Sequence, residues 1–348
     1  MSEIDRLVRD SIIPAKFLEP ETRDDFYIDE NRKKVWALSI DLYLEFERVC
    51  DKHGLSFFTD GGTTLGAIRH GGFIPWDDDI DVCMPRESYE KLKMFACEFK
   101  APYFLQSTET EPNFGYSIMR LRNSNTVADA GNFADCDFNQ GVALDILPLD
   151  KVTKEDYLWR RQRISELIKR NSARMRMSKA SKTQRDIDII SQNFKEDLSS
   201  RDVWDEINKI ATIDEREDTD YISIIVTSMY PPENKIWPIH IFNNFELKEF
   251  ENIKVRVPAG WDEQLKIYFG DYMKFPPKEE RGSWHNIKIM NPDVPFINHK
   301  EMLWGGVNYL IYKPSYLQQA WEKGSEISRG TYPNVLCQLR GNHYSSIL

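Results

Sequence analysis

The sequence predicts an α+β fold in which a mixed sheet core is flanked by helices. Short apolar runs typical of buried strands occur in Leu55–Thr59, Asp79–Met84 and Gly141–Leu147. Longer segments have apolar side chains that recur at helical spacing, so both kinds of element are indicated. The chain has 348 residues, of which 41% are hydrophobic and 29% charged. A chain of that length and composition is expected to bury a large core.

The first elements come from the N-terminal part of the chain. Residues 1–30 are polar, and we expect them to form an irregular lead-in. In residues 31–53 apolar side chains return every three or four positions, which predicts a helix that packs on the sheet. Gly54 follows directly and suits the end of that helix, because glycine readily adopts the left-handed conformation common at this position.

The next stretch predicts a strand, a turn, a short helix and a second strand. Leu55–Thr59 is the first strand and Asp79–Met84 the second. Between them, the pair Gly61–Gly62 permits a sharp bend and a close approach of a ligand to the backbone. Thr63–His70 has the length of two helical turns, and the N–H groups at such a helix start can face a phosphate.

Six further elements are predicted from the rest of the chain. The helices are Glu87–Phe99, Trp204–Ile213 and a short amphipathic one at Trp261–Phe269, and the strands are Tyr116–Leu121, Gly141–Leu147 and Tyr221–Val226. Pro276 and Pro277 cannot continue a helix and mark the end of the last one.

The composition shifts after Asp150. Residues 160–185 contain ten Lys or Arg and a single acid, Glu166. We expect a helix with a solvated basic face; the alternative is a surface for an anionic membrane or a lipid-linked acceptor.

Composition also excludes several classes of protein. A formal net charge of −10 argues against general nucleic-acid binding. The five cysteines are scattered and form no C-x-x-C pair, which argues for reduced thiols and against a zinc site. The N-terminus lacks the features of a signal peptide, and no apolar run reaches membrane-spanning length. We therefore expect a cytoplasmic protein, with peripheral contact at the inner membrane face as an option.

An acidic cluster opens the second predicted strand, at Asp77, Asp78, Asp79 and Asp81. Strand alternation would place Asp77, Asp79 and Asp81 on one face and Asp78 on the other. Three carboxylates on one face repel each other unless a cation lies among them, and a hard divalent ion, Mg²⁺ or Mn²⁺, fits oxygen ligands. The alternative is a solvated acidic turn.

Asp145 is a lone acid inside the apolar run at Gly141–Leu147. A buried aspartate is costly without a cation or several hydrogen-bond donors. We expect a metal carboxylate beside Asp79 and Asp81, which is the pattern of a nucleotidyltransferase-type site; the alternative is a structural aspartate satisfied by donors.

Four blocks of this chain resemble the LicD family, the phosphorylcholine-transferase group related to fukutin-related protein. They are Gly61–Leu92, Arg120–Asn123, Gly141–Asp150 and the stretch from Tyr268 through the two prolines to His285. Trp284 departs from the family pattern, because it stands where the family has the first of two histidines.

The resemblance implies a nucleotidyltransferase-like fold and a metal-dependent transfer reaction. The group moved would be phosphocholine or a relative such as phosphoethanolamine or aminoethylphosphonate. It would pass from a CDP-alcohol or CMP-phosphonate donor to a sugar hydroxyl of a cell-surface glycan (teichoic acid, lipopolysaccharide or capsular polysaccharide), with release of CMP. The acceptor would be a glycan or a lipid-linked glycan.

The candidate site residues fall into two groups. The catalytic and metal-binding candidates are carboxylates: Asp77, Asp79, Asp81 and Asp145, of which Asp79, Asp81 and Asp145 carry the reaction. The substrate-binding candidates are backbone donors, cations and one indole: Gly61, Gly62, Thr63, Arg69, Trp76, Arg120, Arg122, Arg281 and His285. Guanidinium groups match phosphate oxygens in bidentate fashion, which is why four arginines are included.

Two other functions remain open on sequence alone. A nucleotidyltransferase that uses a nucleoside triphosphate would release pyrophosphate in place of CMP. A non-catalytic glycan-assembly protein would be expected to lack one of the metal carboxylates.

The predicted organisation has five parts. They are the lead-in at 1–30, a nucleotidyltransferase-like catalytic core at 31–150, a helical basic insertion at 151–220, the second part of the catalytic domain at 221–300, and a C-terminal extension at 301–348.

Overall fold

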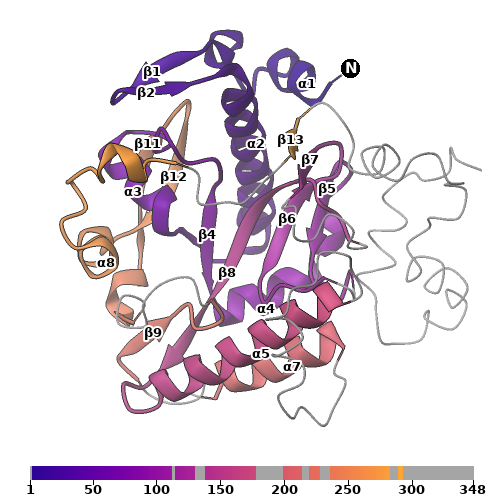
Figure 1. The fold of residues 1–348 in the computed structure, drawn as a ribbon, viewed down its shortest axis with the longest axis vertical. Helices are drawn as coiled ribbons and strands as arrows, with labels where there is room; N and C mark the ends of the chain where they lie inside the picture. Colours follow the sequence, from indigo (N-terminus) through magenta and orange to yellow (C-terminus); the bar gives the residue numbers. More distant parts are fainter. Residues whose placement is uncertain are drawn as a thin grey trace, which may run out of the picture.

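The predicted α+β class is confirmed. A computed structural model describes residues 2–111, 114–129, 138–177, 199–213, 219–227, 236–282 and 289–292. Its main feature is a curled, mixed seven-stranded sheet with helices on both faces, consistent with a nucleotidyltransferase-like fold (Figure 1). No helix among the described residues is long and apolar enough to cross a membrane.

The long strand β8, Val142–Val152, organises the sheet. Along one edge it pairs in parallel with β4, Asp81–Pro85. Along the other edge its first half pairs antiparallel with β6, Met119–Asn123, and its second half with β9, Tyr221–Ser223. An eleven-residue strand therefore brings three separate parts of the chain into one sheet.

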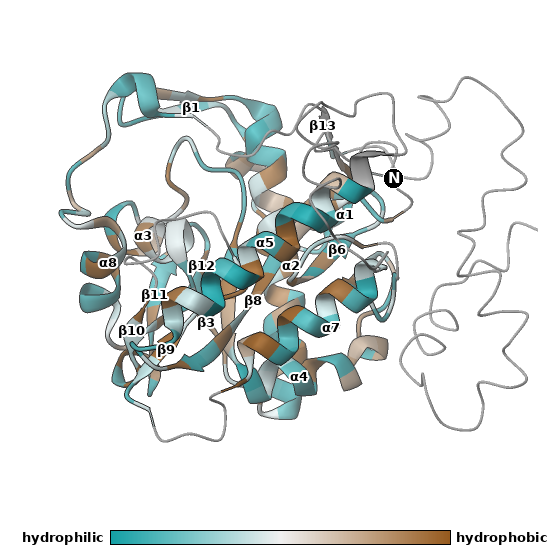
Figure 2. Ribbon diagram, turned by 60° about the horizontal axis from the view of Figure 1, so that its bottom comes forward, coloured by the Kyte–Doolittle hydropathy of each residue, from teal (hydrophilic) through white to brown (hydrophobic). Residues whose placement is uncertain are grey.

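Each face of the sheet has its own hydrophobic core. On one face Val82 and Met84 of β4 pack in the cluster that includes the 24-residue helix α2, Glu30–His53. On the other face Cys83 packs with α5, Tyr157–Met177, and α7, Ser200–Ala211. Hydrophobic and hydrophilic residues alternate along α5 and α7, as expected for helices with one buried face (Figure 2).

The predicted strand–turn–helix–strand unit is present with altered bounds. Strand β3 is only Phe58–Thr59, and α3 begins at the glycine pair, Gly61–Arg69. A turn and an extended stretch then lead to β4, which pairs antiparallel with β3. Helix α8, Trp261–Phe269, and the hairpin of β11, Phe245–Phe250, and β12, Ile253–Pro258, lie on the α3 side of the molecule (Figure 1).

The expectation of an irregular lead-in is wrong. Residues 1–30 contain α1, Glu3–Arg9, whose capping box at Ser2 satisfies its first N–H groups, and a hairpin of β1, Glu21–Arg23, and β2, Phe26–Ile28. The hairpin turn places Asp24 and Asp25 at positive φ. Aspartate tolerates that conformation better than most residues, so the turn forms without glycine.

The other helices and strands complete the architecture: α4 at Arg86–Met94, β5 at Tyr103–Gln106, β7 at Val127–Asp129, β10 at Trp237–Pro238 and β13 at Ile289–Asn291, with short 3₁₀ turns at Ala15–Leu18, Ala96–Glu98, Ile239–Phe242 and Lys278–Glu280. Cys50 and Cys83 are buried, and Cys97 is half-buried. Cys136, Cys337, His285 and the predicted extension at 301–348 lie outside the described residues.

The basic segment is only partly a solvated face. Arg160 is fully buried, and its guanidinium donates to the carbonyl oxygens of Ile210 and Ala211 at the end of α7. Arg174 donates to Ser200 at 2.6 Å. These arginines therefore join α5 to α7, while Arg163 stays exposed.

Candidate active site

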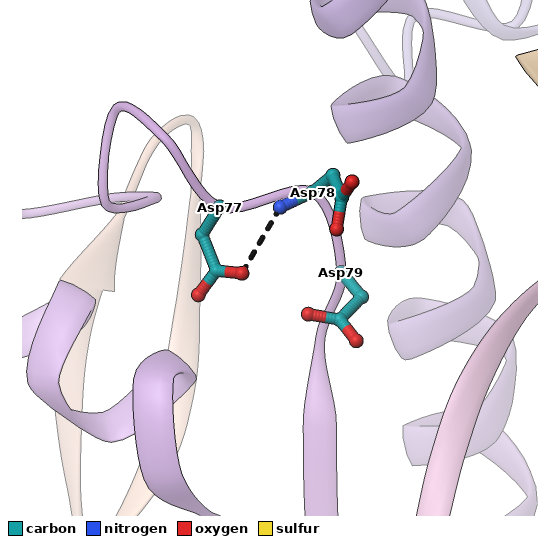
Figure 3. A group of neighbouring side chains, drawn as sticks. All are labelled: Asp77, Asp78 and Asp79. Carbon is teal, nitrogen blue, oxygen red and sulfur yellow. Dashed lines mark hydrogen bonds between the residues drawn. The ribbon is translucent and has the colours of Figure 1, made fainter. Parts of the chain in front are cut away.

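Three consecutive aspartates converge just before β4 (Figure 3). Asp77, Asp78 and Asp79 each offer a carboxylate oxygen, and these oxygens all lie within 4.8 Å of one another. The backbone here is a turn followed by an extended stretch, and Asp77 Oδ1 accepts a hydrogen bond from the Asp78 N–H at 3.1 Å. We call residues 77–79 the acidic turn.

The alternation expected for Asp77–Asp81 is therefore wrong. The strand begins only at Asp81, so the two-residue period does not apply to the acidic turn. As a result Asp78 joins the group from which alternation had excluded it. Among the described residues, the carboxylates close enough to hold one metal ion are these three, and Asp81 is not among them.

Helix α3 lies directly against the acidic turn. Asp60 is its N-cap residue, buried, and accepts a hydrogen bond from Gln264 Nε2 at 3.1 Å. A Cβ on Gly62 would lie 2.5 Å from Asp77 Oδ2, closer than real Cβ contacts allow. Glycine at this position therefore leaves room for the Asp77 carboxylate beside the helix start.

Asp81 and Asp145 are brought together as the sequence predicted, but by strand register. Asp81 on β4 is the direct partner of Asp145 on β8, and Asp145 is the direct partner of Arg120 on β6. Directly opposed residues on paired strands share a face, so the three side chains form one row across the sheet, which we call the central row. Thr63 Oγ1 on α3 accepts the Asp81 N–H at 2.9 Å, which ties the end of this row to the helix.

Arg120 is held firmly by Asp145. Its Nε and Nη2 donate to the two carboxylate oxygens at 2.7 and 2.9 Å, and its guanidinium lies 4.1 Å from the centre of the Tyr116 ring. Burial alone would lower the pKa of Arg120, but Asp145 and Tyr116 outweigh burial and raise it. The donors that Asp145 was expected to need are thus supplied by Arg120.

Arg122 belongs to a buried polar network. It donates to Gln106 Oε1 at 2.8 Å and to the Gly141 carbonyl at 2.5 Å, while Glu111 accepts from the Gln106 amide. Burial lowers the pKa of Arg122 to about 9, and neighbouring Arg120 adds to that effect. With its donors used inside the protein, Arg122 is placed to support β6 and the loop before β8.

Arg69 holds the segment 270–281 against α3, and Arg281 holds it against the N-terminal hairpin. Arg69 Nη1 donates to the Tyr272 carbonyl at 2.6 Å. Arg281 donates to the carbonyls of Pro276 and Asp24 at 3.0 and 3.1 Å. The Arg281 guanidinium also lies 5.1 Å from the Trp76 ring centre, so this buried indole, one residue before the acidic turn, is covered by a cation.

The structure thus gathers most of the predicted residues around α3, the acidic turn and the central row. Gly61, Gly62, Thr63 and Trp76 lie beside the acidic turn or in the same local unit. Sequence reasoning left Asp78 and Asp60 out of the candidate set. An aspartate directly before a glycine-rich helix start is a typical N-cap, so Asp60 had a signal in the sequence.

Comparison with known proteins identifies the domain that carries this geometry. Residues 54–128 match the family model described as LicD/FKTN/FKRP, nucleotidyltransferase domain. The chain carries a LicD-type nucleotidyltransferase domain. The matched range includes α3, the acidic turn, β4 and β6, and it confirms the resemblance indicated by the sequence blocks.

Of two similar proteins, one aligns well beyond the matched domain and the other over a shorter stretch. The lipopolysaccharide cholinephosphotransferase LicD of Haemophilus influenzae is 27% identical over 248 residues, which is 69% of this chain and 90% of that protein. An uncharacterized protein of Rickettsia prowazekii is 32% identical over 78 residues, 22% of this chain and 29% of that protein. The chain is therefore similar over most of its length to a LicD-type transferase.

The acidic turn of this LicD-type domain has the chemistry of a hard-cation site. Its donors are carboxylate oxygens from three adjacent residues, with no nitrogen or sulfur ligand in the group. Mg²⁺ and Mn²⁺ prefer oxygen ligands, and Mg²⁺ in particular uses one or two carboxylates with water and substrate phosphates in the other positions. The residues present therefore fit a divalent cation of this type.

Proposed function

We propose that this protein transfers phosphocholine, or a closely related phospho-alcohol, from a CDP-linked donor to a sugar hydroxyl of a cell-surface glycan and releases CMP. The relative that aligns over 90% of its own length is named as a lipopolysaccharide cholinephosphotransferase, which supports this substrate class. The acidic turn packed against the α3 N-terminus is the observation that carries the proposal, because a diphosphate needs both a cation and nearby donors.

In this proposal Asp77, Asp78 and Asp79 hold a divalent cation, Mg²⁺ or Mn²⁺. When bound, the cation neutralises charge on the donor diphosphate as CMP leaves. Asp81 stands at the start of β4, close enough along the chain to bind through water. This assignment differs from the sequence expectation in three ways: it adds Asp78, it lets Asp81 bind only through water, and it removes Asp145 from direct metal contact.

The protein supplies the remaining phosphate contacts from α3 and β6. Gly61 and Gly62 stand at the first turn of α3, where the side chain of the N-cap residue, Asp60, makes no capping hydrogen bond. Such N–H groups favour a phosphate oxygen. Arg120 presents a guanidinium whose orientation is fixed by Asp145, so the cost of ordering a long side chain is met before substrate arrives. An aspartate of the acidic turn or Asp81 takes the acceptor proton.

The direct test is product analysis with a panel of donors. The purified protein is incubated with Mg²⁺, a glycan acceptor and one donor at a time: CDP-choline, CDP-ethanolamine, CMP-aminoethylphosphonate, CTP or ATP. We expect CMP release that depends on both the acceptor and Mg²⁺, and that chelation abolishes. Pyrophosphate release from a nucleoside triphosphate, without CMP from any CDP-alcohol, would replace this proposal with a nucleotidyltransferase.

Donor binding provides a second measurement that does not require an acceptor. A CDP-alcohol plus Mg²⁺ is expected to raise the melting temperature, because a ligand that binds only the folded state stabilises it by mass action. A larger shift with ATP than with any cytidine nucleotide would contradict the donor assignment.

A further inference from the structure

The carbonyl oxygen of Asp77 accepts hydrogen bonds from two side chains of α2. Arg32 Nη1 and Trp36 Nε1 each donate to it at 2.8 Å. The two donors are four residues apart, so they lie on the same side of the helix, one turn apart. Arg32 and Trp36 together therefore anchor the acidic turn to α2 through one carbonyl oxygen.

Both donors are themselves held in place. Trp36 is fully buried, and its ring stacks on Phe73 with a centroid distance of 4.7 Å and an interplanar angle of 5°. The Arg23 guanidinium covers the same indole at 5.4 Å. The Arg32 guanidinium lies 5.6 Å from the Phe26 ring centre, and the Arg32 N–H is capped by Asp29. The anchor therefore has little freedom to follow the turn if the turn moves.

Asp77 is thus fixed at two points. Helix α2 holds its carbonyl, and α3 leaves room for its carboxylate only because residue 62 is glycine. Three carboxylates within 4.8 Å of one another repel, and a turn without restraint would relieve the repulsion by opening. A cation site that opens in the absence of the ion loses affinity, because closing it again consumes binding energy.

We propose that Trp36 and Arg32 are positioning residues that hold the acidic turn closed before the cation arrives. The role of the cation rests on the proposed function, whereas the restraint on the turn does not. Neither residue was a candidate from sequence, where Trp36 counts only as one more apolar position of a helix.

The test uses conservative variants and a matched control. Trp36→Phe keeps a ring against Phe73 and removes the N–H donor. Arg32→Met removes the second donor and keeps an unbranched side chain, because methionine has no N–H group. Trp237→Phe is the control, because Trp237 is also fully buried and stacked on a ring, Tyr268 at 5.6 Å, while its Nε1 has no hydrogen-bond partner among the described residues. Any effect common to both tryptophan variants reflects lost packing, not the anchor.

Two readouts are measured on the full chain: Mn²⁺ affinity, and hydrogen–deuterium exchange of residues 72–80. We expect the double variant Trp36→Phe/Arg32→Met to bind Mn²⁺ about ten- to 100-fold more weakly, the range seen when partners that orient metal ligands are removed. Its loss should exceed the sum of the single losses, because one remaining donor still restrains the carbonyl. Exchange in residues 72–80 should rise in the double variant and stay at the wild-type level in Trp237→Phe.

The two readouts separate this inference from the proposed function. If the wild type binds no Mn²⁺, the cation in the proposed function is wrong, and the exchange measurement still decides whether α2 holds the turn. If the double variant matches Trp237→Phe in both Mn²⁺ affinity and exchange, the inference is overturned.

Discussion

The acidic turn and the four candidate arginines differ in how their charges are surrounded. At the acidic turn, three like charges are brought within 4.8 Å of one another. The guanidinium groups of Arg69, Arg120, Arg122 and Arg281, by contrast, each donate to an oxygen of the protein itself. The sequence suggested one metal site and four phosphate clamps. In the structure three carboxylates are gathered in the acidic turn, and the four guanidinium groups bind oxygens of the protein.

In the proposed function, this difference indicates where an external ligand would bind. Clustered carboxylates gain most from a cation that comes from outside, because the protein has placed them against their mutual repulsion. An arginine that already satisfies a carboxylate or a carbonyl gains less from a phosphate. Arg120 is the exception, because Asp145 orients it in the central row with Asp81, where the proposed function uses it to bind phosphate.

Removing one charge from the acidic turn should have the largest effect. Asp79→Asn and Asp78→Asn are both expected to lower CMP release by about 1,000-fold, because a metal ion supplies several kcal/mol of transition-state stabilisation and each 1.36 kcal/mol is tenfold. Without Mg²⁺ the same variants should melt at or above the wild-type temperature, since repulsion is relieved. Asp205→Asn, an exposed change on α7, is the control. If Asp78→Asn lowers CMP release only slightly, the result would favour the original expectation that Asp78 points away from the site.

The Arg120–Asp145 pair should give the next largest effect, on stability. Arg120→Met leaves a largely buried carboxylate without its bidentate partner and is expected to cost about 2 kcal/mol in free energy of unfolding. The double variant with Asp145→Asn should recover part of the loss, and a denaturant-based double-mutant cycle measures the coupling. Arg163→Met, at an exposed position on α5, provides the comparison. Additive losses in the cycle would mean that the two side chains act independently.

A smaller effect is expected from filling the space beside Asp77. Gly62→Ala places a methyl group 2.5 Å from the original position of Asp77 Oδ2, so the carboxylate must move. We expect about tenfold weaker activation by Mg²⁺, in line with other changes that misplace a metal ligand. Gly282→Ala is matched to it, because a Cβ there meets no described atom within 4 Å. Equal Mg²⁺ activation curves for the two variants would show that the carboxylate position is unimportant.

The smallest effect is expected at His70, which contacts Arg69, as a pH dependence of the free energy of unfolding. Burial, with Arg69 as the next cause, lowers the pKa of His70 below its ordinary value of 6.5. The neutral ring fits its contacts, because Nε2 accepts from Arg69 Nε at 2.9 Å and Nδ1 lies 3.0 Å from Asp24 Oδ2. As pH falls below about 6.5 the unfolded chain takes up the proton first, so the free energy of unfolding should decrease; above that pH the effect is absent.

His70→Gln tests the assignment, because glutamine does not titrate. Its free energy of unfolding should vary less between pH 7.5 and 5 than that of the wild type. Parallel curves would assign the acid sensitivity to other groups.

Elements with a strong local pattern could be predicted from sequence. The helix expected at residues 31–53 is Glu30–His53, because its apolar period is regular and Gly54 takes the left-handed cap conformation. The N-terminal hairpin was missed because its strands have only three residues each, which is too short to leave a periodic signal.

The site was predictable as a set of residues but not as a set of partners. The position of the carboxylates after the glycine pair indicated a cation site, and the structure gathers three of them there. The pairing of Asp145 with Arg120 depends on the register between β6 and β8, which no local pattern encodes. The error over Asp78 came from applying strand alternation from Asp77 onward, four residues before the strand begins at Asp81.

The N-terminal hairpin has a consequence for the order in which the protein matures. Arg23 makes a bidentate contact with Glu251 at 2.5 and 2.8 Å, Asp25 pairs with Lys278, and the Asp24 carbonyl accepts from Arg281. Glu251 also accepts the Phe73 N–H, so it supports the loop that leads into the acidic turn. At a synthesis rate of 5–20 residues per second, these partners emerge roughly 10 to 50 s after the hairpin. The surroundings of the acidic turn are therefore completed late in synthesis. If synthesis ends before residue 251, the shortened chain lacks Glu251, which is one of the supports of its acidic turn.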